Sequence, residues 1–143
     1  MLKGVNWIAV IVATVLLEVL GFLWYGPLFG EAWTAAMANP PVTDAAGAMN
    51  MKMGLGVVNT LILVLGLDWL VRRLGAASLS AAVMVSLAAW FFFSFTTQAL
   101  EYLYMGMTLN FVVINMGYLL AAFVIAGVTL SVVKFGAAKT AAA

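Results

Sequence analysis

The sequence contains no cysteine and no histidine, and only 8% of its 143 residues are charged. Without cysteine the chain has no disulfides, thiolate metal sites, iron–sulfur clusters or cysteine nucleophiles. Without histidine it lacks the most common general base, metal ligand and haem ligand, and a Ser-His-Asp triad is impossible. The sequence therefore predicts no metal and no cofactor, and it argues against enzymatic activity without excluding it.

Charge is scarce for a protein of this length. About 25% of the residues of a soluble domain are charged, whereas this chain has six Lys or Arg, five Asp or Glu and a net charge of +1. Neither a Gly-rich phosphate loop nor a GxGxxG motif occurs, and the basic residues form no stripe that would bind nucleic acid. Because 66% of the residues are apolar, we expect a single-domain integral membrane protein with membrane lipids, not nucleic acid, as partners.

Four apolar stretches are long enough, or nearly long enough, to cross a bilayer, which takes about 20 residues. They cover residues 5–29, 54–71, 79–100 and 109–133. We therefore predict an all-α membrane protein whose four transmembrane helices form an antiparallel bundle. The short links 72–78 and 101–108 favour antiparallel packing of the last three helices. The final residues, 139–143, are predicted to form a flexible tail.

The link between the first two spans is the longest. Residues 31–38 predict a short helix at the membrane interface, which the Asn-Pro-Pro sequence at 39–41 ends because proline cannot continue a helix. The following residues 42–50 are small and polar, and we expect them to form a mobile connection.

The basic residues are divided unequally between the two sides of the predicted bundle. One side holds Lys3, Arg72, Arg73, Lys134 and Lys139, whereas the other holds Lys52 alone. Because the cytoplasmic side carries the excess of Lys and Arg, both termini are predicted to be cytoplasmic. Asp68 and Arg72 are four residues apart and can pair on one helix face. We interpret this pair as a structural anchor.

Polar side chains within the spans are expected to face the bundle interior, because they are costly in hydrocarbon. When each span is projected at 100° per residue, every helix brings a polar group to the outer half of the bundle. The candidate ligand-binding or proton-linked residues are Glu18, Asn59, Ser94, Thr97, Asn115 and Tyr118. The inner half is mostly aliphatic, so these six residues predict a polar seam that narrows toward the cytoplasm.

Glu18 is the one acidic or basic residue near the middle of a predicted span. Burial disfavours a charged carboxylate. We therefore expect a neutral carboxyl that donates a hydrogen bond, with Tyr118 as the first candidate partner and Asn115 as the second. Two interpretations stay open. Glu18 either binds a ligand or a transported proton, or it only joins two helices, through a hydrogen bond worth about 0.6 kcal/mol in a membrane.

Small residues spaced four apart allow close helix packing. Three such pairs occur, Ala9-xxx-Ala13, Gly117-xxx-Ala121 and Gly127-xxx-Ser131. We expect most of them to serve packing within the chain, with a homodimer through one of them as the alternative.

Two stretches resemble a known family. The first contains NWIAV at 6–10 and GFLWYGPLFGEAW at 21–33, and the second runs from FVVINMGY at 111–118 to Gly127. They are similar to the small bacterial four-helix membrane family known only as a domain of unknown function, number 1761. This resemblance implies a bacterial inner-membrane protein and no particular activity. The family typically has an apolar residue where Glu18 stands, so the resemblance assigns Glu18 no role.

Three functional hypotheses follow. The first is a non-enzymatic membrane protein that binds a lipid-like small molecule or a protein partner, such as a larger membrane complex, through the polar seam. The alternative is a proton-coupled small transporter or a channel protomer in which Glu18 is the coupled group. The weakest is a lipid-modifying enzyme with Glu18 and Tyr118 as acid and base, since no second deep carboxylate and no histidine is present.

Overall fold

The computed structural model describes residues 3–37 and 46–133. Helices joined by short turns make up these residues, and they contain no strand. The all-α prediction is therefore confirmed for this part of the chain. The proline stop at 39–41, the basic residues Lys134 and Lys139, and the tail at 139–143 lie outside the described residues.

Four helices in the described residues are long and apolar enough to cross a membrane, at Trp7–Leu28, Met49–Arg73, Leu79–Met105 and Leu109–Val132. The elements are α1 (Trp7–Leu23), the π-helical turn η1 (Trp24–Leu28), α2 (Gly30–Ala36), α3 (Ala46–Arg73), α4 (Leu79–Ala89), the π-helical segment η2 (Trp90–Phe95), α5 (Thr96–Met105) and α6 (Leu109–Val132). This pattern is that of a multi-pass membrane protein.

Two helices are longer than their predicted spans. α3 begins at Ala46 instead of residue 54, and the third span continues through α5 to Met105 instead of residue 100. Within the connection 42–50 that the sequence predicts to be mobile, residues 46–50 are helical and residues 42–45 lie outside the described residues. Alanine and methionine in this stretch favour a helix despite its low hydropathy. The short helix expected at 31–38 is present as α2, and residue 38 lies outside the described residues.

The helix ends follow from local sequence. Asn6, Ser78 and Thr108 precede α1, α4 and α6, and the side chain of each accepts a hydrogen bond from a backbone N–H in the first turn. At the other ends, Gly75 follows α3 and Gly106 ends α5 with φ of 63° and 64°, a left-handed conformation that glycine adopts without strain. Polar caps and glycines thus set the lengths of the helices.

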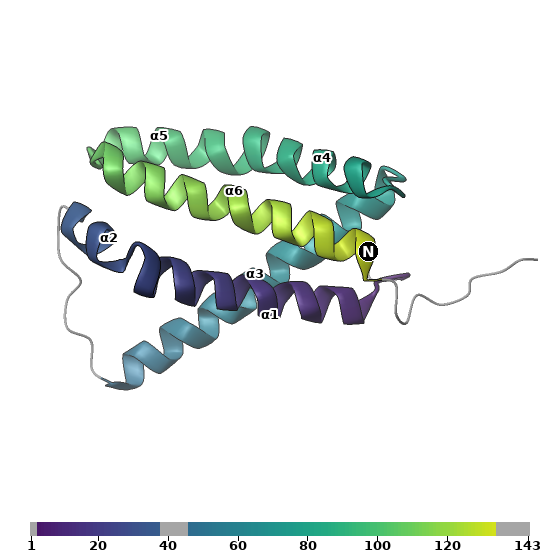
Figure 1. Ribbon diagram of the computed structural model, residues 1–143, viewed down its shortest axis with the longest axis horizontal. Coiled ribbons are helices and arrows are strands. Elements are labelled where there is room, and N and C mark those ends of the chain that lie inside the picture. Colours follow the sequence, from purple (N-terminus) through teal and green to yellow (C-terminus); the bar gives the residue numbers. More distant parts are fainter. Residues whose placement is uncertain (1–2, 38–45, 134–143) are drawn as a thin grey trace, which may run out of the picture.

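Three helical layers pack together, and one helix departs from them. Figure 1 shows α4 and α5 running along α6, with α1 on the other side of α6 and α3 crossing obliquely. Side chains from Met49 to Asn59 on α3 are all exposed, whereas Val64, Leu67 and Val71 farther along the helix are buried. The second half of α3 therefore packs into the bundle and the first half does not.

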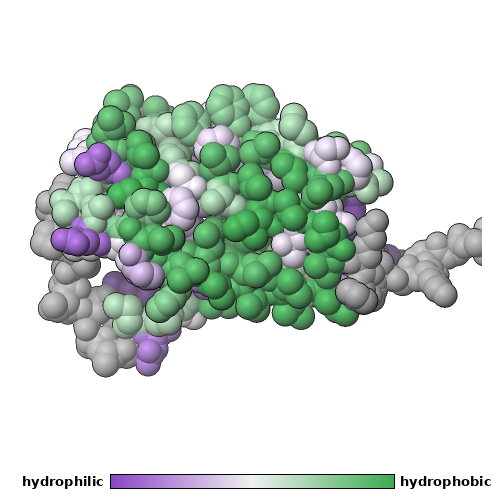
Figure 2. All heavy atoms as spheres, in the orientation of Figure 1, coloured by the Kyte–Doolittle hydropathy of each residue, from purple (hydrophilic) through white to green (hydrophobic). Residues whose placement is uncertain are grey.

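Small residues form much of the core. Ala9 and Ala13 on α1 and Ala126 on α6 are fully buried. A Cβ atom added to Gly127 on α6 would lie 2.6 Å from Ser86 Oγ on α4. The pair at 9/13 and Gly127 of the pair at 127/131 therefore contribute to packing within the chain. The outer surface is apolar across the middle of the face shown in Figure 2, and hydrophilic residues gather toward its ends.

Candidate functional site

The π-helical turn η1 brings the end of the first span against α6. Gly26 in this turn has a non-helical backbone (φ −103°, ψ −106°), and Pro27 has no N–H to donate. The indole of Trp24 donates a hydrogen bond to the carbonyl of Ile114 at 3.0 Å, and the hydroxyl of Tyr25 donates one to Asn115 Oδ1 at 2.9 Å. Two side chains of this turn are thereby joined to one turn of α6.

An aromatic cluster surrounds these hydrogen bonds. The outer aromatic cluster consists of Trp24, Tyr25, Trp33, Phe111 and Tyr118. The ring of Tyr25 lies 5.0 Å from that of Tyr118 and 5.1 Å from that of Trp33, and Trp33 stacks on Phe111 at 6.4 Å. η1, α2 and α6 are therefore held together at this end of the molecule by aromatic contacts and by the hydrogen bonds of Trp24 and Tyr25.

Glu18 lies below this cluster on α1 and is half-buried. The hydroxyl of Tyr118 lies 3.4 Å from the position of a Cβ added to Gly21, which follows Glu18 by three residues on the same helix. No described residue forms a hydrogen bond or ion pair with Glu18, so the predicted bond to Tyr118 is not formed. Asn115, the second candidate partner, is bonded to Tyr25 instead.

The other three candidates lie elsewhere. Asn59 is exposed on the half of α3 that leaves the bundle, and Thr97 is exposed with its hydroxyl donating to the carbonyl of Phe93 at 2.6 Å. Ser94 lines a lateral groove of about 360 Å³ together with Leu63, Gly66 and Phe123. The structure therefore brings Glu18, Asn115 and Tyr118 together, and it does not form a seam that joins all four helices.

Tyr25 and Trp24 are polar residues of this region that are not among the six candidates. Tyr25 follows Glu18 by seven residues, which is two helical turns and places both on one face of a regular helix. That spacing was the available signal for Tyr25. Trp24 lies one position earlier in the helical projection, and its indole reaches the carbonyl of Ile114 on α6.

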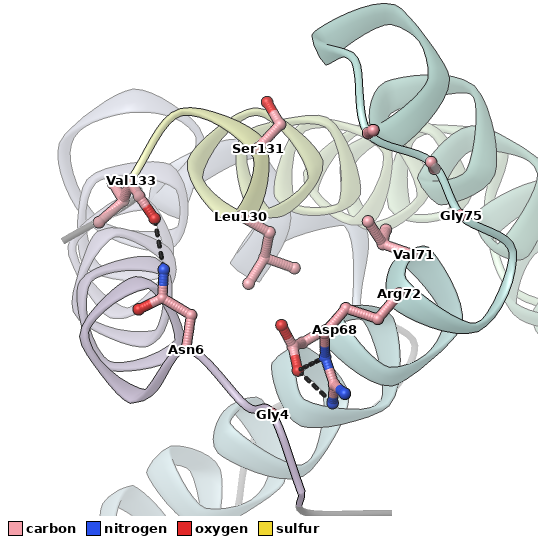
Figure 3. Close-up of a pocket in the computed structure, with 11 residues that line it drawn as sticks. Gly4, Asn6, Asp68, Val71, Arg72, Gly75, Leu130, Ser131 and Val133 are labelled. Atoms are coloured by element: carbon pink, nitrogen blue, oxygen red, sulfur yellow. Dashed lines mark hydrogen bonds and ion pairs between the residues drawn. The ribbon is translucent and has the colours of Figure 1, made fainter. Parts of the chain in front are cut away.

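A second group of polar residues lies at the other end of the bundle (Figure 3). Asp68 is buried, and its Oδ2 accepts a hydrogen bond from Arg72 Nε at 2.8 Å and lies 2.7 Å from Arg72 Nη2. The predicted pairing of these residues is confirmed. Beside the pair is a cavity of about 300 Å³. At its rim, the amide of Asn6 donates to the carbonyl of Val133 at 2.6 Å and ties the start of α1 to the end of α6.

The charged residues do not gather as metal ligands. Among the described residues, no three Asp or Glu side chains lie together in a way that could hold an ion. The two acidic side chains within the packed part of the bundle, Glu18 and Asp68, are at different levels, and Asp68 is already paired with Arg72. Glu18 and Asp68 can therefore form hydrogen bonds with a ligand or bind a proton.

Comparison with known proteins gives one match. A family model described as "Protein of unknown function (DUF1761)" matches residues 8–131. No curated protein and no solved structure matches the chain. The matched range contains the outer aromatic cluster, Glu18 and the Asp68–Arg72 pair. Since it covers most of the sequence, the chain belongs to this family of proteins of unknown function.

Proposed function

We propose that the protein is a non-enzymatic protein of the bacterial inner membrane that binds a lipid-like small molecule beside Glu18 and Tyr118. One observation carries the proposal. The Tyr118 hydroxyl lies 3.4 Å from the position of a Cβ added to Gly21, which is one helical turn from Glu18, and neither Glu18 nor Tyr118 forms a hydrogen bond with a described residue. The family resemblance supports the bacterial inner membrane, and the distribution of basic residues supports cytoplasmic termini.

The energetics favour a ligand with a polar group at this point. A polar group that loses water without gaining a hydrogen bond costs about 1–3 kcal/mol. Glu18 and Tyr118 are half-buried, so the cost applies in part to each of them. A molecule from the bilayer that presents a hydroxyl, carbonyl or amide group would supply the missing partners while its apolar part stays in the lipid. Quinones and lipids have this composition.

Native mass spectrometry of the gently solubilised protein tests the proposal. The wild type is expected to retain a lipid or quinone, and Glu18→Leu and Tyr118→Phe are expected to reduce the retained fraction about tenfold, because each removes a hydrogen bond worth about 1.4 kcal/mol. Glu101→Gln is the matched control, since Glu101 is an exposed carboxyl near the end of α5. Equal retention by all four folded proteins would remove the basis of the proposal.

The same experiment separates the other hypotheses. A larger membrane protein that co-purifies and is lost on Glu18→Leu would assign the site to a protein partner, and the measured masses also report a homodimer.

The hypothesis of a proton-coupled transporter depends on the same carboxyl group and needs a separate experiment. It requires that proteoliposomes containing the wild type acidify or alkalise under a solute gradient and that Glu18→Gln abolishes this response, whereas the binding proposal predicts no such flux.

A further inference from the structure

The cavity beside Asp68 is a second candidate site, distinct from the one at Glu18. It lies at the opposite end of α1 from the outer aromatic cluster, where α3 ends, α6 ends and the chain enters α1. Its volume is about 300 Å³, and its lining includes Gly4, Val71, Gly75 and Leu130 besides the Asp68–Arg72 pair. This volume is at the lower end of the range for small-molecule sites, so the cavity fits a small polar group and not a whole lipid.

The cavity contains a buried acceptor. Asp68 is only 5% exposed. Both contacts with Arg72 are made by Oδ2, and no described residue donates to the second oxygen, Oδ1. In Figure 3 this second oxygen points away from Arg72, toward Leu130 and the hollow. A carboxylate offers about four acceptor positions, so the cavity wall presents a negatively charged oxygen that can accept a hydrogen bond from a ligand.

Positive charge lies next to this acceptor. We define the basic cluster as Lys3, Arg72 and Arg73, which line an adjoining depression of about 250 Å³ together with Trp69. Arg72 belongs to both hollows, and its Nη1 also donates to the carbonyl of Lys3 at 3.0 Å. A ligand that enters the cavity from this side therefore meets Lys3 and Arg73 outside, and the Asp68–Arg72 pair with its second carboxylate oxygen inside.

We propose that this site binds a phosphoethanolamine headgroup, with the ammonium donating to Asp68 and the phosphate at the basic cluster. The second oxygen of Asp68 can accept a hydrogen bond from a cationic donor, and Lys3 and Arg73 place positive charge for an anion beside it, so the arrangement suits a zwitterion. The site also lies at the ends of the helices, beside Trp69, where the headgroups of a bilayer are found. Acyl chains attached to the phosphate would lie outside the cavity against the apolar surface.

The geometry distinguishes between headgroups. A primary ammonium donates N–H hydrogen bonds to a carboxylate, and such charge-assisted bonds are stronger than neutral ones. A trimethylated ammonium has no N–H and is larger, so a choline headgroup can neither donate a hydrogen bond to Asp68 nor fit into the cavity as well. A glycerol headgroup carries the phosphate without a cation and would contact the basic cluster alone. We therefore expect at least a tenfold preference for ethanolamine lipid over both of the others.

The test is native mass spectrometry of the full chain in nanodiscs that contain equal amounts of phosphatidylethanolamine, phosphatidylcholine and phosphatidylglycerol. Asp68→Asn replaces the charged acceptor, and Ala76→Leu fills the cavity while it leaves the Asp68–Arg72 pair in place, since Ala76 is a lining residue that takes no part in the pair. Glu101→Gln is the control. Both site variants are expected to reduce the preference to about one, and the control is expected to retain it.

Each result of this experiment either supports or overturns the proposed headgroup site. A wild type without preference, or a preference that survives in Ala76→Leu, overturns the proposal even if Asp68→Asn does not fold. Equal retention of the ethanolamine and glycerol lipids also overturns it, because only the basic cluster would then be acting. Displacement of the lipid by free phosphoethanolamine supports the same chemistry, and retention of the free compound without lipid would assign the site to a soluble ligand. Glu18→Leu changes neither result, so this site and the proposed function can fail independently.

Discussion

Replacing Gly127 with alanine introduces one methyl group at the closest approach of α4 and α6. The new Cβ would lie 2.6 Å from Ser86 Oγ, 3.0 Å from Ser86 Cβ and 3.2 Å from the carbonyl oxygen of Ala82. Ser86 and Ala82 are fully buried. The Ser86 hydroxyl can rotate away from the methyl group, but the other two atoms belong to or adjoin the backbone of α4. The two helices must therefore move apart.

The size of the effect follows from two opposing terms. An extra methyl group in a well-packed core costs about 1–3 kcal/mol, and alanine is favoured over glycine within a helix by up to about 1 kcal/mol. We therefore expect Gly127→Ala to lose about 1–2 kcal/mol of unfolding free energy. Ser86→Gly removes the two nearest atoms, so the double variant is expected to recover part of the loss, because its effects are not additive.

Reversible unfolding in mixed micelles with increasing SDS, followed by tryptophan fluorescence, measures this loss. Gly56→Ala is the matched control, because nothing lies within 4 Å of an added Cβ on that exposed part of α3. The control is expected to be neutral or slightly stabilised. If Gly127→Ala unfolds at the same SDS fraction as Gly56→Ala, the close contact between α4 and α6 does not exist and the packing argument is refuted.

Two further predictions concern the outer end and the topology. In a double-mutant cycle with Tyr25→Phe and Asn115→Leu, the hydrogen bond between the side chains is expected to give a coupling energy of about 0.6–1.7 kcal/mol in the same unfolding assay. Strictly additive losses would contradict that bond. A reporter fused after residue 143 is expected to be active in the cytoplasm, because five of the six basic residues are predicted to be on that side. A periplasmic signal would overturn the predicted orientation.

The sequence was sufficient to predict the four long apolar helices and the pairing of residues that are close in sequence. Long apolar runs predict spanning helices because any other backbone would leave unpaired N–H and C=O groups in lipid. The pairing of Asp68 with Arg72 was predictable from their four-residue spacing alone, since both lie on one turn of one helix. Neither result depends on how the helices are arranged around each other.

The polar seam was predictable only in part, because a helical projection assumes one straight helix with 100° per residue. The π-helical segment η2 breaks this assumption just before Thr97, and η1 does so at Trp24. η2 adds residues to a turn, and η1 contains a kink at Gly26, so in both cases the residues that follow face a different direction. For Asn59 the projection failed for another reason. It identifies the residues on one face of α3, but not that this half of the helix lies away from the bundle.

Because the first half of α3 lies away from the bundle, the tilt of this helix depends on the thickness of the bilayer. With 28 residues at 1.5 Å each, α3 is about 42 Å long, whereas the hydrocarbon layer is about 30 Å thick. A helix longer than the layer tilts to keep its apolar residues covered. Since side chains from Met49 to Asn59 contact no neighbouring helix closely enough to be buried, bilayer thickness sets the inclination of this part. A thicker bilayer would therefore reduce the tilt of the first half of α3, and because the second half is packed against α1, the helix would have to bend between the two halves.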